Sequence, residues 1–162
     1  MGRLIKSEDL QLPLDFVWYD MIVAGDKREE YREITAYWVN RLLGESGYSD
    51  DYLEEEVRRL HLKGRAIPEN VEQLFRSGHL VALPYKTVTF RRGYTRETVT
   101  FRITGIDIRQ GNPNWGAKPG RKYLVISFKP ILKEDSHTFE ASHGDIRRGE
   151  TAIVFPAGKT DA

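Results

Sequence analysis

The chain has 162 residues, and its 25 lysines and arginines nearly balance its 24 aspartates and glutamates, for a formal net charge of +1. A chain of this length forms one domain with its own hydrophobic core, and the charge balance excludes a histone-like polycation without excluding a local basic patch. Cysteine is absent, which excludes disulfide frameworks, zinc ribbons and cysteine nucleophiles.

The N-terminal segment MGRLIKSEDL is too polar for a signal peptide, and residues 3–6 within it predict a short first strand. No apolar run approaches the roughly 18 residues that a membrane-spanning helix needs. The sequence therefore predicts a soluble cytoplasmic protein without a membrane partner.

Apolar residues recur at helical spacing between Leu12 and Ala24, which predicts an amphipathic helix with Pro13 in its first turn. Gly25 is suited to end this helix. The predicted apolar face comprises Leu14, Val17, Trp18, Met21 and Ile22. Residues 26–34 are mostly charged and show no clear preference for helix or strand.

Two further helical regions follow. Residues 35–43 predict a helix with a threonine cap and a core-facing tryptophan. Residues 44–80 predict a helical insertion with two helices. The first is capped by residues 49–51 and ends at Gly64, and the last begins at Pro68 and ends at Gly78. Residues 44–57 include six acids and no base, so we expect this surface to lie away from nucleic acid or, alternatively, to bind a protein partner.

The second half of the chain changes to strand patterns. Residues 86–92 and 97–104 both contain TVTFR, in which threonine alternates with larger apolar residues, and this predicts a hairpin. Its second strand is expected to continue through Ile108. Residues 111–120 hold three glycines and two prolines and predict a loop, whereas residues 122–132 predict a central strand. Helices followed by strands indicate an α+β fold with a small, partly open barrel.

Residues 25–32, GDKREEYR, form the most informative cluster of charges. Alternate residues of an extended segment share a face. The two faces would comprise Lys27, Glu29 and Tyr31 on one side and Arg28, Glu30 and Arg32 on the other. A turn near Asp26 would instead bring the lysine beside Glu30. Lysine supplies a point cation and arginine a planar fork for carboxylate or phosphate, but an ordinary solvated charge cluster is the alternative interpretation.

The string Gly25-x-Lys27-x-x-Glu30-x-Arg32 resembles the GxKxxExR signature of the ASCH domain family, part of the PUA-like superfamily. Other segments that resemble bacterial and phage ASCH proteins are FVWYDMIVAG, YREITAYWVNRLL, VTFRRGY and NWGAKPGRKYLVISF. The resemblance covers residues 3–131 and implies a PUA-like β-barrel of about five or six strands flanked by helices.

The resemblance also sets the expected domain organisation. An ASCH-like domain would span residues 1–131 and include the helical insertion at about 44–80. Residues 132–162 would form a C-terminal extension that packs on the barrel or trails from it. The chain would thus consist of one ligand-binding domain with two additions.

The resemblance further implies a cleft beside the barrel that is lined by the motif, in a superfamily that generally binds RNA or modified nucleobases. Some ASCH proteins are ribonucleases, and others deacylate N4-acetylcytidine with a lysine, a threonine and a glutamate. Lys27 matches that lysine, and Glu30 stands where the threonine would be. We therefore expect a domain that binds RNA or a nucleotide without a cofactor. The alternatives are a hydrolase, either an amidohydrolase or a ribonuclease with Lys27 and Glu30 as catalytic residues, and a protein-interaction adaptor.

Basic residues also gather on the predicted hairpin, where the segment 86–109 has six bases and two acids. Such a surface can hold a phosphate backbone and stack a base, or merely decorate a soluble hairpin. Trp115 either stacks on a ligand or, as we favour, anchors its loop. The expected ligand-binding residues are Gly25, Lys27, Glu30, Arg32, Tyr19, Arg91, Arg92, Tyr94 and Trp115. The four histidines match no zinc motif, so no metal is expected.

Overall fold

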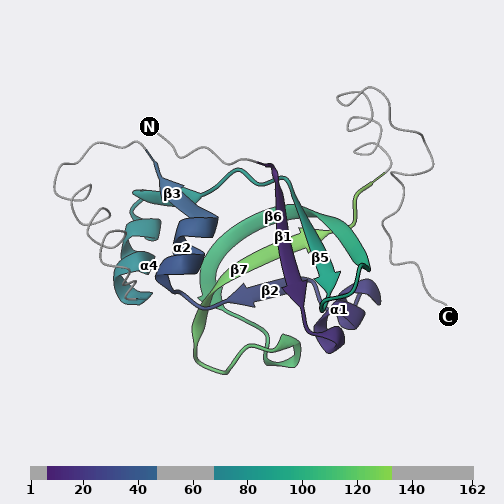
Figure 1. The fold of residues 1–162 in the computed structure, drawn as a ribbon. Coiled ribbons are helices and arrows are strands. Elements are labelled where there is room, and N and C mark those ends of the chain that lie inside the picture. The colour runs from purple at the N-terminus through teal and green to yellow at the C-terminus, as the bar shows by residue number, and fades with distance from the viewer. Residues whose placement is uncertain (1–6, 47–67, 133–162) are drawn as a thin grey trace. The chain divides into compact units, whose positions relative to one another are not determined.

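The computed structural model describes residues 7–46 and 68–132 of the chain. These residues form three α-helices, a short 3₁₀ helix and two β-sheets, so the predicted α+β class is confirmed (Figure 1). The larger sheet has the order β1-β5-β6-β7-β2. Its strands are β1 (Asp9–Leu14), β5 (Thr87–Arg92), β6 (Thr98–Gln110), β7 (Lys122–Lys129) and β2 (Glu29–Arg32). The other elements are β3 (Leu43–Glu45), β4 (Leu80–Ala82), α1 (Phe16–Val23), α2 (Ala36–Leu42), α4 (Pro68–Arg76) and η1 (Pro113–Trp115).

The described residues divide into two compact units. Unit 1 comprises residues 29–46, 68–84 and 105–126, and unit 2 comprises residues 7–28, 85–104 and 127–132. Strands β6 and β7 each contribute residues to both units. The predicted first strand at 3–6, the first helix of the insertion and the C-terminal extension beyond Leu132 lie outside the described residues.

Unit 2 contains the predicted hairpin. Strands β5 and β6 pair antiparallel, with Val88 opposite Phe101 and Phe90 opposite Val99. Their alternation places Val88, Phe90 and Phe101 in the core while threonines occupy the other face. The hairpin and the continuation of its second strand through the buried Ile108 are therefore confirmed.

The predicted start of the first helix is wrong. The structure has a strand up to Leu14, parallel to β5, and α1 begins only at Phe16. Leucines at positions 10, 12 and 14 are all buried, which is the period of two that a strand produces. Pro13 is tolerated because β1 lies at the edge of the sheet, where a missing N–H breaks no ladder. The expected helix face changes accordingly: Val17 is exposed, and Tyr19 and Ile22 are the buried residues of α1.

Unit 1 contains the capped helix and the end of the insertion. The Thr35 hydroxyl accepts a hydrogen bond from the Trp38 backbone N–H (3.3 Å), so the predicted cap of α2 is confirmed. Helix α4 begins at the predicted Pro68 and buries Val71 and Leu74. Gly78 follows its last turn with a φ of 86°, as expected of a glycine that ends a helix.

Two short strands of unit 1 were not predicted. Strand β3 pairs antiparallel with β4, and Glu45 lies opposite Leu80. A strand of three residues is too short for its alternation of buried and exposed side chains to be recognised in a sequence. Strand β7, by contrast, lies between β6 and β2, and Tyr123 to Ile126 are all buried, so the predicted central strand is confirmed. None of the helices in the described part of the chain is long and apolar enough to cross a membrane.

Replacing Phe90 should destabilise unit 2 strongly. Its side chain is fully buried, and its ring centroid lies 5.0 Å from that of Phe128 and 6.2 Å from that of Phe101. Phe90→Ala should lower the free energy of unfolding by about 3–5 kcal/mol, and Phe90→Leu by about 1 kcal/mol, in urea titrations. Tyr94→Ala is the control, because this exposed ring should contribute less than about 0.5 kcal/mol. Equal losses in Phe90→Ala and Tyr94→Ala would contradict the assignment of this core.

Candidate functional site

The end of α1 sets the position of the first motif residues. Gly25 has a φ of 85°, a left-handed conformation that other residues adopt only with strain. The backbone N–H groups of Asp26 and Lys27 both donate to the Met21 carbonyl, at 2.8 and 3.2 Å. The chain therefore turns tightly before Lys27, and the backbone conformation of this turn accounts for the glycine in the motif.

The boundary between the two units falls inside the motif. Gly25 and Lys27 belong to unit 2, and Glu30 and Arg32 belong to unit 1. Lys27 is only 1% exposed, and its ammonium nitrogen lies 5.3 Å from the centre of the Trp18 ring. A cation over an aromatic face is attracted by the ring quadrupole, which compensates part of its lost hydration. The half-buried Trp18 thus contacts a motif residue in addition to any role in the core.

Strand β2 sorts the rest of the motif onto two faces. The Tyr31 hydroxyl donates to a Glu29 carboxylate oxygen at 2.7 Å, so residues 29 and 31 share one face. A guanidinium nitrogen of Arg32 lies 3.1 Å from a Glu30 carboxylate oxygen, so residues 30 and 32 share the other. The extended interpretation of residues 29–32 and its division into faces are therefore confirmed.

Glu30 is 5% exposed, and together with Lys27 it makes up the set of buried charged residues in the part of the chain that the structure describes. An ionised group removed from water is costly unless a counter-charge and hydrogen bonds compensate it. Arg32 supplies a counter-charge to Glu30, and its guanidinium carbon lies 4.9 Å from the centre of the Trp38 ring. Trp38 is therefore half-buried beneath a motif residue instead of being a plain core residue.

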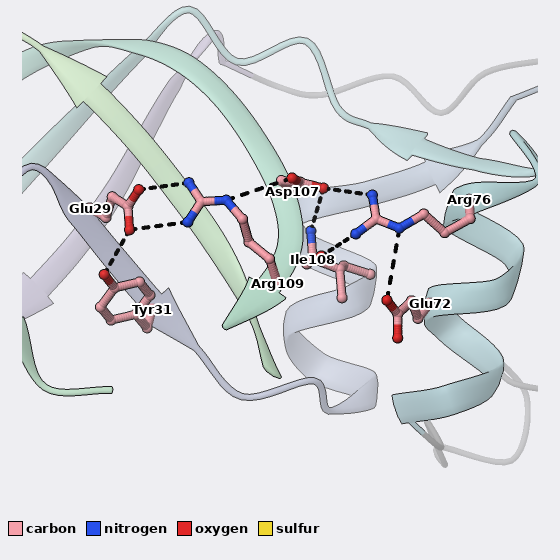
Figure 2. A network of polar contacts seen from close by, with 7 residues as sticks. All are labelled: Glu29, Tyr31, Glu72, Arg76, Asp107, Ile108 and Arg109. Atoms are coloured by element: carbon pink, nitrogen blue, oxygen red, sulfur yellow. Dashed lines mark hydrogen bonds and ion pairs between the residues drawn. The ribbon is translucent and has the colours of Figure 1, made fainter. Parts of the chain in front are cut away.

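The opposite face of β2 joins a network of charges within unit 1 (Figure 2). The two carboxylate oxygens of Glu29 accept from Arg109 on β6, at 2.6 and 3.3 Å. Arg109 also lies 3.7 Å from Asp107, two residues earlier on the same strand. The pKa of Arg109 is raised, chiefly by its hydrogen bonds to Glu29. This face of β2 is thus tied to β6 by a two-pronged ion pair.

The network continues to α4. Arg76 pairs with Asp107 at 3.0 Å and donates to the Ile108 carbonyl oxygen (Figure 2). The Nε atom of Arg76 also lies 3.8 Å from Glu72, one helical turn earlier. Glu72 in turn accepts from Lys122 at 2.8 and 3.0 Å, on the first residue of β7. Helix α4 is therefore held to β6 and β7 by charges rather than by its apolar face alone.

The loop after β6 is fastened to the same network. The Tyr31 hydroxyl accepts a hydrogen bond from the Asn112 backbone N–H at 2.9 Å, and burial raises the pKa of this tyrosine. Trp115 packs against a cluster formed by Tyr31, Ala117, Tyr123 and Val125. A Cβ atom on Gly111 would lie 2.5 Å from the Tyr31 ring, so only glycine fits this approach. This packing is what the favoured interpretation of Trp115 as a loop anchor expects.

On the hairpin, the predicted ligand-binding residues differ in the contacts that their side chains make within the protein. Arg92 donates to both carboxylate oxygens of Asp20 (2.8 and 3.0 Å), lies 3.9 Å from Glu97, and stacks 4.1 Å from the centre of the Phe16 ring. These hydrogen bonds lower the pKa of Asp20 and raise that of Arg92. Arg91 is exposed and donates to the Thr95 carbonyl oxygen, and the Tyr94 ring is completely exposed.

Tyr19, expected near the cleft, is a core residue that is 2% exposed. Its pKa is raised to about 12, chiefly by burial and also by the Glu97 carboxylate, whereas Arg92 opposes the rise. The neutral phenol is therefore the form that the fold favours. Among the described residues no group of histidine, aspartate and glutamate side chains is arranged to hold a metal ion.

Comparisons with protein-family models, curated proteins and solved structures gave no match. The site is therefore defined by its own geometry. The sequence identified the motif but missed the network of Glu29, Tyr31, Glu72, Arg76, Asp107 and Arg109. One pattern in the sequence pointed to part of this network. A predicted strand carries Asp107 and Arg109 two residues apart, which places both charges on the same face of β6.

Tyr31→Phe should destabilise the chain although it removes a single oxygen atom. The variant leaves the Asn112 N–H without this acceptor and Glu29 without this donor, which should cost about 1–2 kcal/mol in urea-induced unfolding. Tyr94→Phe is a matched control because its hydroxyl is exposed. If the two variants were equally stable, the Tyr31 hydroxyl would not hold the loop.

The raised pKa of Tyr19 makes stability fall at high pH. An unfolded tyrosine ionises near pH 10, whereas folded Tyr19 keeps its proton to about pH 12. The contribution of the neutral phenol is thus present below about pH 10 and is lost as the pH rises toward 12. Unfolding free energies measured across this range should fall more steeply in the wild type than in Tyr19→Phe. Identical slopes would contradict the burial of Tyr19.

Proposed function

We propose that this chain is an ASCH-like domain with a PUA-like barrel and that it binds RNA or a nucleotide through Lys27, Glu30 and Arg32. The observation that carries the proposal is the burial of the first two of these charges. The alternative interpretation of the motif as an ordinary solvated charge cluster is disfavoured, because such a cluster would keep both side chains in water. Buried ionisable groups with specific partners occur more often at functional sites than elsewhere, so their burial supports a binding or catalytic role.

The chain itself keeps the motif residues near one another. Two residues separate Lys27 from Glu30, so their Cα atoms lie within about 11 Å of each other at full extension. Arg32 has a planar guanidinium with five N–H donors, a fork that matches the oxygens of a phosphate or a base edge. In the proposed complex, Arg32 contacts a phosphate or a base edge, Glu30 orients it, and Lys27 adds positive charge.

The hairpin supplies a second, weaker contribution. Tyr94 offers an exposed ring for stacking, and Arg91 and Arg96 offer exposed cations beside it in the sequence. Arg92 orders this tip through Asp20 and Phe16 rather than contacting the ligand. Few phosphates would be neutralised, so the affinity should depend only weakly on salt.

Binding is tested with short single-stranded RNAs, nucleosides and nucleotides in calorimetric titrations. Lys27→Met keeps the length of the side chain and removes its charge, and it should weaken binding by about tenfold or more. The control is Lys129→Met, which removes an equally long but exposed cation. Failure of every RNA, nucleoside and nucleotide to bind the folded wild-type protein would overturn the proposal.

The burial of Lys27 also favours a second candidate, a hydrolase that uses this lysine as its reactive group. A desolvated lysine can serve as a base or nucleophile where its surroundings favour the neutral amine. Incubation with N4-acetylcytidine and with single-stranded RNA separates the two candidates. Product that forms with the wild type and not with Lys27→Met would assign an enzyme, whereas binding without turnover would assign a binding domain.

A further inference from the structure

The hairpin tip, residues 91–97, is held against the start of α1 within unit 2. The Gly93 backbone N–H donates to the carbonyl of the last residue of β1 at 2.8 Å. The Phe16 ring occupies the space that a Cβ atom on Gly93 would need. Arg92 stacks 4.1 Å from the centre of the same ring and pairs with Asp20 at 2.8 Å. The tip is therefore an ordered surface, fixed to α1 by a ring contact and an ion pair.

The outward side of the tip combines an aromatic ring with cations. Tyr94 is completely exposed, and the exposed Arg91 and Arg96 lie three residues before it and two residues after it. In the part of the chain that the structure describes, neither of these two arginines forms an ion pair, whereas Arg92 is offset by Asp20. An accessible ring between cations is the combination on which bases of single-stranded nucleic acid stack.

Helix α1 lies between the tip and the contact that Lys27 makes. Phe16 and Asp20 are four residues apart, so they share the side of α1 that holds the tip. Trp18, over which the Lys27 ammonium lies, is two residues from each of them and hence about 160° away around the helix axis. Within unit 2, the tip and the motif lysine are therefore placed on nearly opposite sides of this helix.

This placement limits what a single nucleotide can contact. An α-helix with its side chains is about 10–12 Å across, so a nucleotide bound beside Lys27 does not also stack on Tyr94. A ligand that contacts both sides of α1 has to be a chain. Single-stranded RNA is such a chain, since it offers unpaired bases to a ring and phosphates to arginines.

We propose that the hairpin tip is a second RNA-contact site, in which Tyr94 stacks on an unpaired base and Arg91 and Arg96 contact the phosphates beside it. The domain then binds a single strand of several nucleotides in preference to a free nucleotide. The placement of another part of that strand at Lys27 rests on the proposed function. The tip site itself rests on the geometry of unit 2.

Two other roles of the tip make different demands on its side chains. Charges that only keep a hairpin in solution require no ligand. An acidic polypeptide would pair with Arg91 and Arg96, but it would not require an aromatic ring between them. The decisive comparison is therefore Tyr94→Phe, which keeps a ring for stacking, with Tyr94→Leu, which keeps apolar bulk without one.

The test uses calorimetric titrations of the full chain with adenosine and cytidine monophosphates and with oligoadenylates and oligocytidylates of increasing length. We expect the longer RNAs to bind at least about tenfold more tightly than the monophosphates. Tyr94→Leu should weaken the binding of the longer RNAs by about fivefold or more, and Tyr94→Phe should not. Arg91→Ala and Arg96→Ala should each reduce the salt dependence of RNA binding, by about 0.7 in the slope of log K against log salt.

The control is Tyr37→Leu, which removes another exposed tyrosine, outside the tip, and should keep the gain in affinity with RNA length. If nucleotides and RNAs bind but affinity does not rise with length, or Tyr94→Leu keeps the rise, the tip site is overturned and the proposed function stands. If Tyr94→Leu weakens RNA binding and Lys27→Met weakens no ligand, the tip site stands and the proposed function fails.

A poly-glutamate peptide distinguishes RNA from an acidic protein partner. If this peptide binds as tightly as the longer RNAs and is weakened equally by Tyr94→Leu, the tip takes an acidic polypeptide and the RNA site is overturned. Failure of every RNA to bind the folded wild-type chain overturns it as well.

Discussion

The motif region depends on one constraint, which is that an ionised side chain can leave water only where partners replace its hydration. Lys27 and Glu30 meet this constraint differently, because the ammonium lies over the Trp18 indole and the carboxylate faces the Arg32 guanidinium. The turn at Gly25 that ends α1 positions Lys27, and the alternation of β2 places Glu30 and Arg32 on the same face. The local structure is thus arranged around two charges, where most folds would place an apolar residue.

Strand β2 presents different partners on its two faces. Glu29 and Tyr31 face the network that holds β6, α4 and the loop after β6, and Glu30 and Arg32 face Trp38. The network is mostly half-exposed, so its separate ion pairs are weak, but shared partners make them cooperative. A slip of one residue in β2 would exchange the two faces, and the network fixes the register against it.

Local patterns made much of this architecture predictable from the sequence. The hairpin follows from alternation, and the cap of α2 follows from a hydroxyl within reach of an N–H three residues ahead. The start of α1 is mispredicted because Pro13 suits a first helical turn as well as an edge strand, and only pairing with the distant β5 decides between them. The charge network joins residues that are 31 and 80 positions apart, so no local pattern contains it.

The pairing of β3 with β4 has a consequence for how this chain can change over evolutionary time. Glu45 and Leu80 are neighbours across the ladder, and α4 is held to β6 by Arg76. The described residues on either side of positions 47–67 therefore adjoin elements with defined partners in unit 1. Closing a longer or shorter loop between fixed ends costs free energy that grows only with the logarithm of its length. Between two such ends a change in length is expected to cost little free energy, and the motif at residues 25–32 lies outside this stretch of the sequence.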